Sequence, residues 1–279
     1  MESPFNPHWV KLVRYQHPEK MLGFARNIDD PTIAALYGMD AESYRSTRIR
    51  LEQQGREAAL QLLEDAAFAD RVDQLPFQQG EIVIGVGEST TDDRLSWFEI
   101  VRYLLDIRRP QDGIRLINEG VSGNTSTQVL GRMIGIINQQ PDWIICMIGG
   151  NDTLRIGPEP TKCQVSLEET VINLKAIRTI AATGTQARWV WMTPPTIDEQ
   201  RARMNPYFRQ GELVWRNDDI ESIGQFIRNQ SDPVVDTQLD FGNPASSEWM
   251  EQDGIHPSIE GQKAIAKRLI VELTGGTTE

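Results

Sequence analysis

Ser89, Asp253 and His256 are residue types suited to nucleophilic cleavage of an ester. That chemistry requires a hydroxyl that attacks the carbonyl carbon, a base that takes its proton, an acid that orients the base, and donors for the oxyanion. Asp253 precedes His256 by three residues in Asp-Gly-Ile-His-Pro, so its carboxylate can reach Nδ1 while Nε2 faces a serine hydroxyl. The other histidines, His8 and His17, lie near the N-terminus with no matching acid nearby. An Asp and a His at this spacing can also be a turn residue and a surface residue, so other segments must support the pair.

The sequence around Ser89 places this serine just beyond a predicted strand. Ser89 follows the apolar run 82–86 in the context Gly-Glu-Ser-Thr-Thr. In open α/β sheets ligands bind at the carboxyl ends of the strands, which is where this serine would lie. Ser89 could instead cap the following helix, as serines often do, and its position taken alone favours the cap.

Two segments rich in Gly and Asn follow later apolar runs. Gly123 lies in Ser-Gly-Asn-Thr, where the missing side chain lets a backbone N–H come close to a ligand. Asn151 lies in Gly-Gly-Asn-Asp, and its amide could donate a hydrogen bond to a developing oxyanion. Each segment alone is compatible with an ordinary turn. Both are predicted at the same edge of the sheet as Ser89, so together they support one site.

Short apolar runs alternate with longer amphipathic stretches after residue 80, which predicts βα units on a parallel sheet. The predicted strands are residues 82–86, 114–118, 143–148, 189–193 and 234–236. The predicted helices lie near residues 94–108, 126–139, 166–182, 212–229 and 259–273. With helices on both faces, five parallel strands form a three-layer α/β/α sandwich.

Residues 1–80 do not show this alternation and are predicted to form an N-terminal helical extension, with residues 81–279 as the domain that carries the candidate site. Asp30 and Pro31 signal a helix start, as an N-cap residue followed by Pro at the first helical position. Residues 76–80 are predicted to be the linker between the two domains.

A longer helical region is predicted from residue 41 to residue 75, with Gly55 as a potential break. Its predicted buried face is Ala59, Leu62, Leu63, Ala66, Ala69 and Val72. Because soluble monomers rarely leave so long an apolar stripe uncovered, the stripe predicts packing on the α/β domain or homo-oligomerisation through the N-terminal helices.

Charge and composition narrow the range of partners. The formal charge is −12 at pH 7, whereas nucleic-acid binding depends on clustered Lys and Arg, so we expect no nucleic-acid partner. No basic start followed by an apolar run marks a secretory signal, and no apolar stretch approaches the roughly 18 residues of a membrane span. The two cysteines, Cys146 and Cys163, do not make a disulfide framework. These features predict a cytoplasmic protein without a membrane partner.

Taken in order, the four segments resemble blocks I, II, III and V of the SGNH (GDSL) hydrolases, and the similarity spans residues 81–273. The resemblance implies a flavodoxin-like fold and an acyl-ester hydrolase that needs no cofactor and no metal. The implied triad is Ser89 as nucleophile with Asp253 and His256. The implied oxyanion donors are the backbone N–H of Ser89, the backbone N–H of Gly123 and the side chain of Asn151.

One position departs from the family signature, because the usual Gly-Asp-Ser-Leu is here Gly-Glu-Ser-Thr, with Glu88 before the serine. Glu88 keeps the acidic character, so we expect altered local packing and not lost activity. A typical α/β-hydrolase is disfavoured, because Thr91 stands where the G-x-S-x-G elbow needs Gly. The chain contains no H-E-x-x-H, Walker-type or Rossmann pattern.

The resulting hypothesis is a serine hydrolase that forms an acyl-enzyme on Ser89 and cleaves short-chain acyl or acetyl esters of a soluble small molecule or sugar. Acyl transfer by the same triad, and a non-catalytic binding or scaffold role, are the alternatives. The insert 194–216 contains Met204, Tyr207, Phe208 and Trp215. These side chains could wall the substrate pocket or cover the core, and the sequence favours neither.

Overall fold

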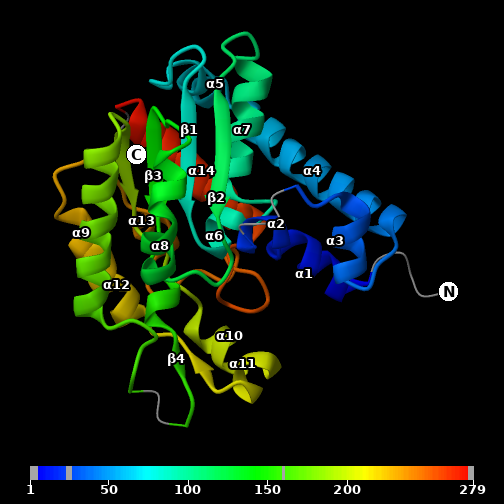
Figure 1. Ribbon diagram of the computed structural model, residues 1–279, viewed down its shortest axis with the longest axis vertical. Helices are drawn as coiled ribbons and strands as arrows, with labels where there is room; N and C mark the ends of the chain where they lie inside the picture. The colour runs from blue at the N-terminus through cyan, green and yellow to red at the C-terminus, as the bar shows by residue number, and fades with distance from the viewer. Residues whose placement is uncertain (1–5, 23–26, 159–160, 276–279) are drawn as a thin grey trace.

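A central parallel sheet organises the molecule (Figure 1). The computed structural model describes residues 6–22, 27–158 and 161–275. The strands of this sheet are β1 (Ile82–Gly87), β2 (Arg115–Gly120), β3 (Trp143–Met147), β5 (Arg188–Met192) and β7 (Val234–Val235). They lie in the order β2-β1-β3-β5-β7, and all neighbouring strands are parallel. The predicted five-stranded parallel sheet is therefore confirmed.

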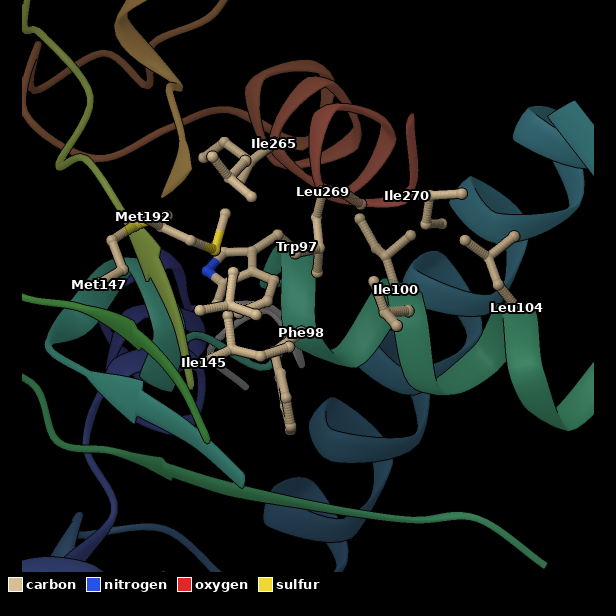
Figure 2. Packing of buried hydrophobic residues seen from close by; sticks show 14 of the residues in the cluster. Trp97, Phe98, Ile100, Leu104, Ile145, Met147, Met192, Ile265, Leu269 and Ile270 are labelled. Atoms are coloured by element: carbon tan, nitrogen blue, oxygen red, sulfur yellow. The ribbon is translucent and has the colours of Figure 1, made fainter. Parts of the chain in front are cut away.

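Alternating side chains along the strands build a separate core on each face of the sheet. In β1, Val83 joins one core, while Ile84 and Val86 join the other. The first face is covered by α7 (Trp97–Arg108) and α14 (Ile259–Leu273), whose interlocking apolar side chains are visible in Figure 2. The second face is covered by α8 (Ser126–Ile137), α9 (Leu167–Gly184) and α12 (Asn217–Arg228). These layers form the predicted α/β/α sandwich.

The helix predicted over residues 212–229 begins later than expected. β6 (Leu213–Val214) pairs antiparallel with β4 (Arg155–Ile156) and forms a small second sheet. The helix α12 consequently starts at Asn217. The sequence gives no signal for this pairing, because strands of two residues are too short to show an alternating pattern.

Residues before the sheet form helices, as predicted. Their bounds are α1 (Pro7–Tyr15), α2 (Pro18–Met21), α3 (Asp30–Leu36), α4 (Ala41–Leu63) and α5 (Ala66–Asp73). The N-cap of α3 is Asp29, whose carboxylate accepts a hydrogen bond from the N–H of Thr32 at 3.0 Å. Asp30 was predicted as this cap, and that prediction is wrong by one residue, because the carboxylate of Asp29 satisfies the first free N–H groups of the helix.

The long helical region breaks at a different place from the one predicted. α4 continues through Gly55 without interruption, and the break falls at Asp65, whose carboxylate accepts the N–H of Ala67 at 2.9 Å and so caps α5. A Cβ on Gly55 would lie 2.9 Å from Cε2 of Tyr103. Gly55 is thus the point where α4 and α7 come close together, and not a break.

The N-terminal helices share a core with the sheet. Of the predicted buried face, Ala59, Ala69 and Val72 are buried, Leu62 and Leu63 are partly buried, and Ala66 is exposed. This stripe packs on α7 and α14. In the predicted linker, Phe77 is buried with its ring edge-on to Trp143 at 5.2 Å between centroids. Both predicted domains therefore contribute to one core, while their boundary at residue 80 remains a prediction.

The longest helix of the described residues is α4, and it is polar along its length. α4 has 23 residues, but Arg and Glu side chains recur along it. Over residues 6–22, 27–158 and 161–275, no helix combines the length and the apolarity needed to cross a membrane.

Candidate active site

The candidate site lies at the carboxyl edge of the sheet, where three strands deliver the predicted motifs. β1 ends at Gly87, and Ser89 opens the short helix α6 (Ser89–Asp92). Gly123 lies in the turn between β2 and α8, and β3 leads into the 3-10 helix η1 (Asn151–Thr153). The chain reverses its direction across the sheet between β1 and β3, and such a switch point opens a crevice in which doubly wound sheets bind ligands.

Ser89, His256 and Asp253 form a chain of hydrogen bonds. The Oγ of Ser89 lies 3.1 Å from Nε2 of His256, and Nδ1 of His256 lies 2.8 Å from Oδ2 of Asp253. The other carboxylate oxygen of Asp253 accepts the backbone N–H groups of Ile255 at 2.9 Å and His256 at 3.0 Å. The structure thus brings together the three residues predicted as nucleophile, base and acid.

The surroundings of Asp253 keep its carboxylate charged. Burial disfavours the charge, but the neighbouring His256 and the two backbone N–H donors outweigh it and hold the pKa of Asp253 well below its usual range. An ionised carboxylate accepts Nδ1–H of His256 and leaves the lone pair of Nε2 directed at Ser89. This is the arrangement a general base requires.

The two predicted oxyanion segments contact each other. Gly123 has φ +82°, a conformation that favours glycine, and a Cβ there would meet no atom within 4 Å, so this turn is open on the side where a side chain would lie. The side-chain Nδ2 of Asn151 donates to the carbonyl oxygen of the neighbouring Asn124 at 3.1 Å. A side-chain amide has two N–H groups, and this bond uses one of them. The other can donate to an oxyanion.

Glu88, the departure from the family signature, links the ends of β1 and β3. Its carboxylate oxygens accept the backbone N–H groups of Gly150 at 3.1 Å and Asn151 at 3.0 Å. A Cβ on Gly150 would lie 2.5 Å from Oε1 of Glu88, so a side chain at this position would force the carboxylate of Glu88 to shift. Glu88 thereby fixes the backbone of Asn151.

The environment of Glu88 opposes its ionisation. Burial raises its pKa to about 8, and the nearby Asp152 acts in the same direction, while the two N–H donors act against both. Near neutral pH, the carboxyl group of Glu88, which accepts the N–H groups of Gly150 and Asn151, is therefore close to its pKa.

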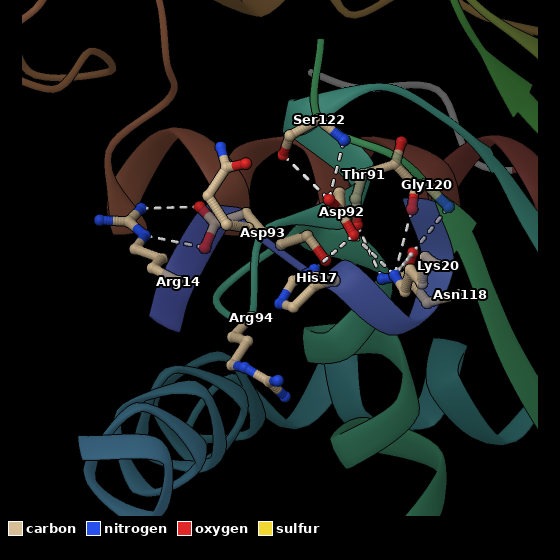
Figure 3. Close-up of polar contacts among 12 residues, drawn as sticks. Arg14, His17, Lys20, Thr91, Asp92, Asp93, Arg94, Asn118, Gly120 and Ser122 are labelled. Atoms are coloured by element: carbon tan, nitrogen blue, oxygen red, sulfur yellow. Dashed lines mark hydrogen bonds and ion pairs between the residues drawn. The ribbon is translucent and has the colours of Figure 1, made fainter. Parts of the chain in front are cut away.

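Asp92, at the end of α6, joins the oxyanion side of the site to the N-terminal helices (Figure 3). One oxygen accepts the N–H of Ser122 at 2.8 Å and its hydroxyl at 2.9 Å. The other lies 2.6 Å from Nζ of Lys20 and 2.6 Å from Nδ1 of His17. Burial opposes the charge, but Lys20 and His17 hold the pKa of Asp92 well below its usual range. The acid that pairs with His17 is thus Asp92, which lies 75 residues later in the sequence.

The four large side chains of the insert 194–216 divide between the two predicted positions, the protein core and the wall of a pocket. Trp215 is buried, and Phe208 packs edge-on against it with 5.1 Å between centroids. Met204 and Tyr207 are instead 68% and 76% exposed. They border a hollow of about 530 Å³ that reaches Asp253. Two of the four side chains therefore cover the core, and two line a hollow beside the site.

Sequence reasoning missed the residues that connect the motifs. Glu88 stands out in the sequence as a departure from the family signature, but the sequence does not predict its bonds to Gly150 and Asn151. Asp92 lies three residues after Ser89, and this closeness is the only signal that could have singled it out. The centroid of the Tyr15 ring lies 4.8 Å from that of the His256 ring. Nothing in the sequence signals this contact. Within the described part of the chain, no three His, Cys, Asp or Glu side chains are grouped so that they could hold a metal ion.

Comparison with known proteins defines the class of this one. Residues 81–264 match the GDSL-like lipase/acylhydrolase family, and this is more than half of the chain. The chain belongs to that family, so the predicted resemblance is confirmed. Among curated relatives, an acetylxylan esterase from Geobacillus stearothermophilus is 29% identical over 61% of this chain and 77% of its own length. The thioesterase 1/protease 1/lysophospholipase L1 of Escherichia coli K12 is 27% identical over 58% of this chain and 69% of its own.

Solved structures agree with the family assignment. The crystal structure of Axe2, an acetylxylan esterase from Geobacillus stearothermophilus, superposes with a TM-score of 0.54 and 27% identity. The superposition covers 70% of this chain and 95% of that one. The fold class is that of the SGNH hydrolases, and the predicted enzyme class, a carboxylic ester hydrolase, is confirmed.

Glu88→Gln should change how stability depends on pH. The pKa of Glu88 rises from 4.5 to about 8 on folding, so between these values the folded protein binds a proton that the unfolded chain has lost. Stability therefore falls as pH rises through this window. Across this pH window, the free energy of unfolding of the wild type should fall by more than about 1.4 kcal/mol, the equivalent of one pKa unit, beyond any change in that of Glu88→Gln. Urea unfolding at several pH values measures the difference, and parallel curves for the two proteins would contradict it.

Proposed function

We propose that the protein hydrolyses carboxylic esters through an acyl-enzyme on Ser89, with His256 as general base and Asp253 as the acid that orients it. The observation that carries the proposal is the hydrogen-bonded chain from Ser89 Oγ through His256 to Asp253, at 3.1 and 2.8 Å. Membership of the GDSL-like lipase/acylhydrolase family supports the same reaction.

In the proposed mechanism, Oγ of Ser89 attacks the ester carbonyl carbon while Nε2 of His256 takes the hydroxyl proton. The oxyanion accepts hydrogen bonds from the backbone N–H groups of Ser89 and Gly123 and from the amide of Asn151. The bond to the leaving alcohol then breaks, and His256 donates its proton to the alcohol oxygen. A water molecule, deprotonated by His256, attacks the acyl-enzyme, releases the carboxylic acid and restores Ser89. Asp253 stays ionised throughout and stabilises the imidazolium.

The proposed substrate is a short-chain acyl ester, above all an acetyl ester, of a small molecule or sugar. The hollow beside Asp253 is lined by charged and amide side chains together with Met204, Pro206 and Tyr207, and Tyr207 is exposed at its edge. An exposed tyrosine ring offers an apolar face against which the C–H groups of a sugar ring can pack. The relative named acetylxylan esterase supports the acetyl group, while the name of the E. coli relative includes thioesterase and lysophospholipase.

Ser89→Ala should abolish hydrolysis of p-nitrophenyl acetate and covalent labelling by a fluorophosphonate, because the attacking oxygen is gone. Folding should persist, since Ser89 is only half-buried at the end of a strand. Ser222→Ala is the matched control, because the Ser222 hydroxyl only bonds the carbonyl of Asp218 within α12. Labelling or activity above a few per cent in Ser89→Ala would assign the nucleophile elsewhere.

Asn151→Ala should lower kcat by roughly a hundredfold or more and leave KM nearly unchanged, because an oxyanion donor acts mainly in the transition state. Steady-state kinetics on p-nitrophenyl acetate measure both constants. Asn229→Ala serves as control, because its amide bonds only the carbonyl of Gln225 on an exposed surface of the molecule. A loss expressed in KM alone would make Asn151 a substrate-binding residue.

Activity should fall as the acyl chain lengthens. The hollow beside Asp253 has the charged side chains Lys11, Asp198 and Arg201 in its lining, so it offers a long apolar chain little continuous apolar surface on which to be buried. A series of p-nitrophenyl esters, from acetate to decanoate, measures kcat/KM against chain length. A maximum at decanoate would overturn the proposed substrate class without affecting the proposed triad.

A further inference from the structure

The N-terminal helix α1 reaches the candidate active site although it lies outside the family match at residues 81–264. Tyr15, its last residue, places its ring against the imidazole of His256, with 4.8 Å between centroids and 38° between planes. This spacing and tilt lie within the range of attractive aromatic contacts. This ring contact leaves both imidazole nitrogens bonded to Ser89 and Asp253.

Arg14 anchors this end of α1 to both sides of the site. Its Nε and one terminal nitrogen each lie 2.8 Å from the carboxylate of Asp93 (Figure 3). Its other terminal nitrogen lies 2.6 Å from Glu251. The paired bonds to Asp93 form a planar fork, which fixes direction as well as distance. Asp93 follows the helix that begins at Ser89, and Glu251 precedes Asp253. The anchors of Tyr15 are thus the segments that carry the proposed triad.

The ring of Tyr15, and not its hydroxyl, carries the interaction with His256. The hydroxyl oxygen is buried and, among the residues that the structure describes, has no hydrogen-bond partner. A buried polar atom without a partner costs stability, so the hydroxyl does not explain why a tyrosine stands here. An aromatic face beside an imidazole does two things. It blocks rotation of the ring away from Ser89, and its negative π face attracts the imidazolium that forms during catalysis.

We infer that Tyr15 is a positioning residue for His256, so that helix α1 contributes a residue to the active site. The inference rests on the proposed function, because it assigns Tyr15 a role only if His256 is the base. The ring holds the imidazole in line between Asp253 and Ser89. Without it, the imidazole is free to turn, and the fraction of time in which Nε2 faces the hydroxyl falls.

Tyr15→Leu should lower kcat for p-nitrophenyl acetate by about tenfold to a hundredfold, the range expected when a catalytic group is slightly misplaced. KM should stay within about twofold, because Tyr15 is not proposed to touch the substrate. Tyr15→Phe keeps the ring and should retain wild-type kcat. The matched control is Phe68→Leu, which removes a buried ring from α5 in the same N-terminal region and should leave kcat unchanged.

Circular dichroism and thermal unfolding establish that each variant is folded. If Tyr15→Leu does not fold, Tyr15→Met takes its place under the same criterion, since a flexible side chain fills irregular gaps. The inference is overturned if the folded variant keeps wild-type kcat, or if Tyr15→Phe loses as much as Tyr15→Leu. Failure of the proposed function looks different, because wild-type protein would then not be labelled on Ser89 by a fluorophosphonate.

Discussion

The bridge from Glu88 to the backbone N–H groups of Gly150 and Asn151 sets the geometry of the whole site. It joins the segments just beyond two adjacent strands, one of which leads to the proposed nucleophile Ser89 and the other to the proposed oxyanion donor. Parallel pairing alone fixes the strands but leaves the loops beyond them free to move. A buried carboxyl that accepts two N–H bonds removes that freedom, since breaking the bridge would leave three polar groups unsatisfied. Positioning in this site therefore comes from the residue beside the serine as much as from the triad.

The fold and the contact between Asp253 and His256 could be inferred from sequence because both depend on local patterns. Apolar runs at a regular spacing specify a parallel sheet, and its carboxyl edge then gathers the loops that follow the strands. The contact between Asp253 and His256 spans only three residues, so spacing predicts it. Contacts between distant segments have no such signal. The bond from His17 to Asp92 joins residues 75 positions apart, and the pairing of β4 with β6 likewise joins segments far apart in the sequence.

The insert shows a different limit of sequence reasoning. Phe208, Trp215, Met204 and Tyr207 are all large apolar or aromatic residues, and composition cannot tell which of them are buried. The structure separates them through the small sheet β4–β6, which ends just before Trp215 and carries that residue into the core. α10 (Glu199–Met204) and α11 (Pro206–Gln210) project beyond this anchor, so Met204 and Tyr207 stay exposed. The hollow beside Asp253 thus depends on a two-residue strand pairing.

The acids that follow Ser89 explain why the N-terminal helices cannot be treated as an appendage to the family fold. Asp92 and Asp93 are 2% and 0% exposed, and their cationic partners are Lys20 and Arg14. Replacing a buried ion pair by apolar side chains is often tolerated, but removing one partner leaves a buried charge without compensation. Loss of the segment that carries Arg14 and Lys20 would leave two such carboxylates within four residues of Ser89. They would have to take up protons or draw water into the site, and either change would disturb α6. The N-terminal helices therefore stabilise the charge state of the loop that presents the proposed nucleophile, in addition to covering α7 and α14.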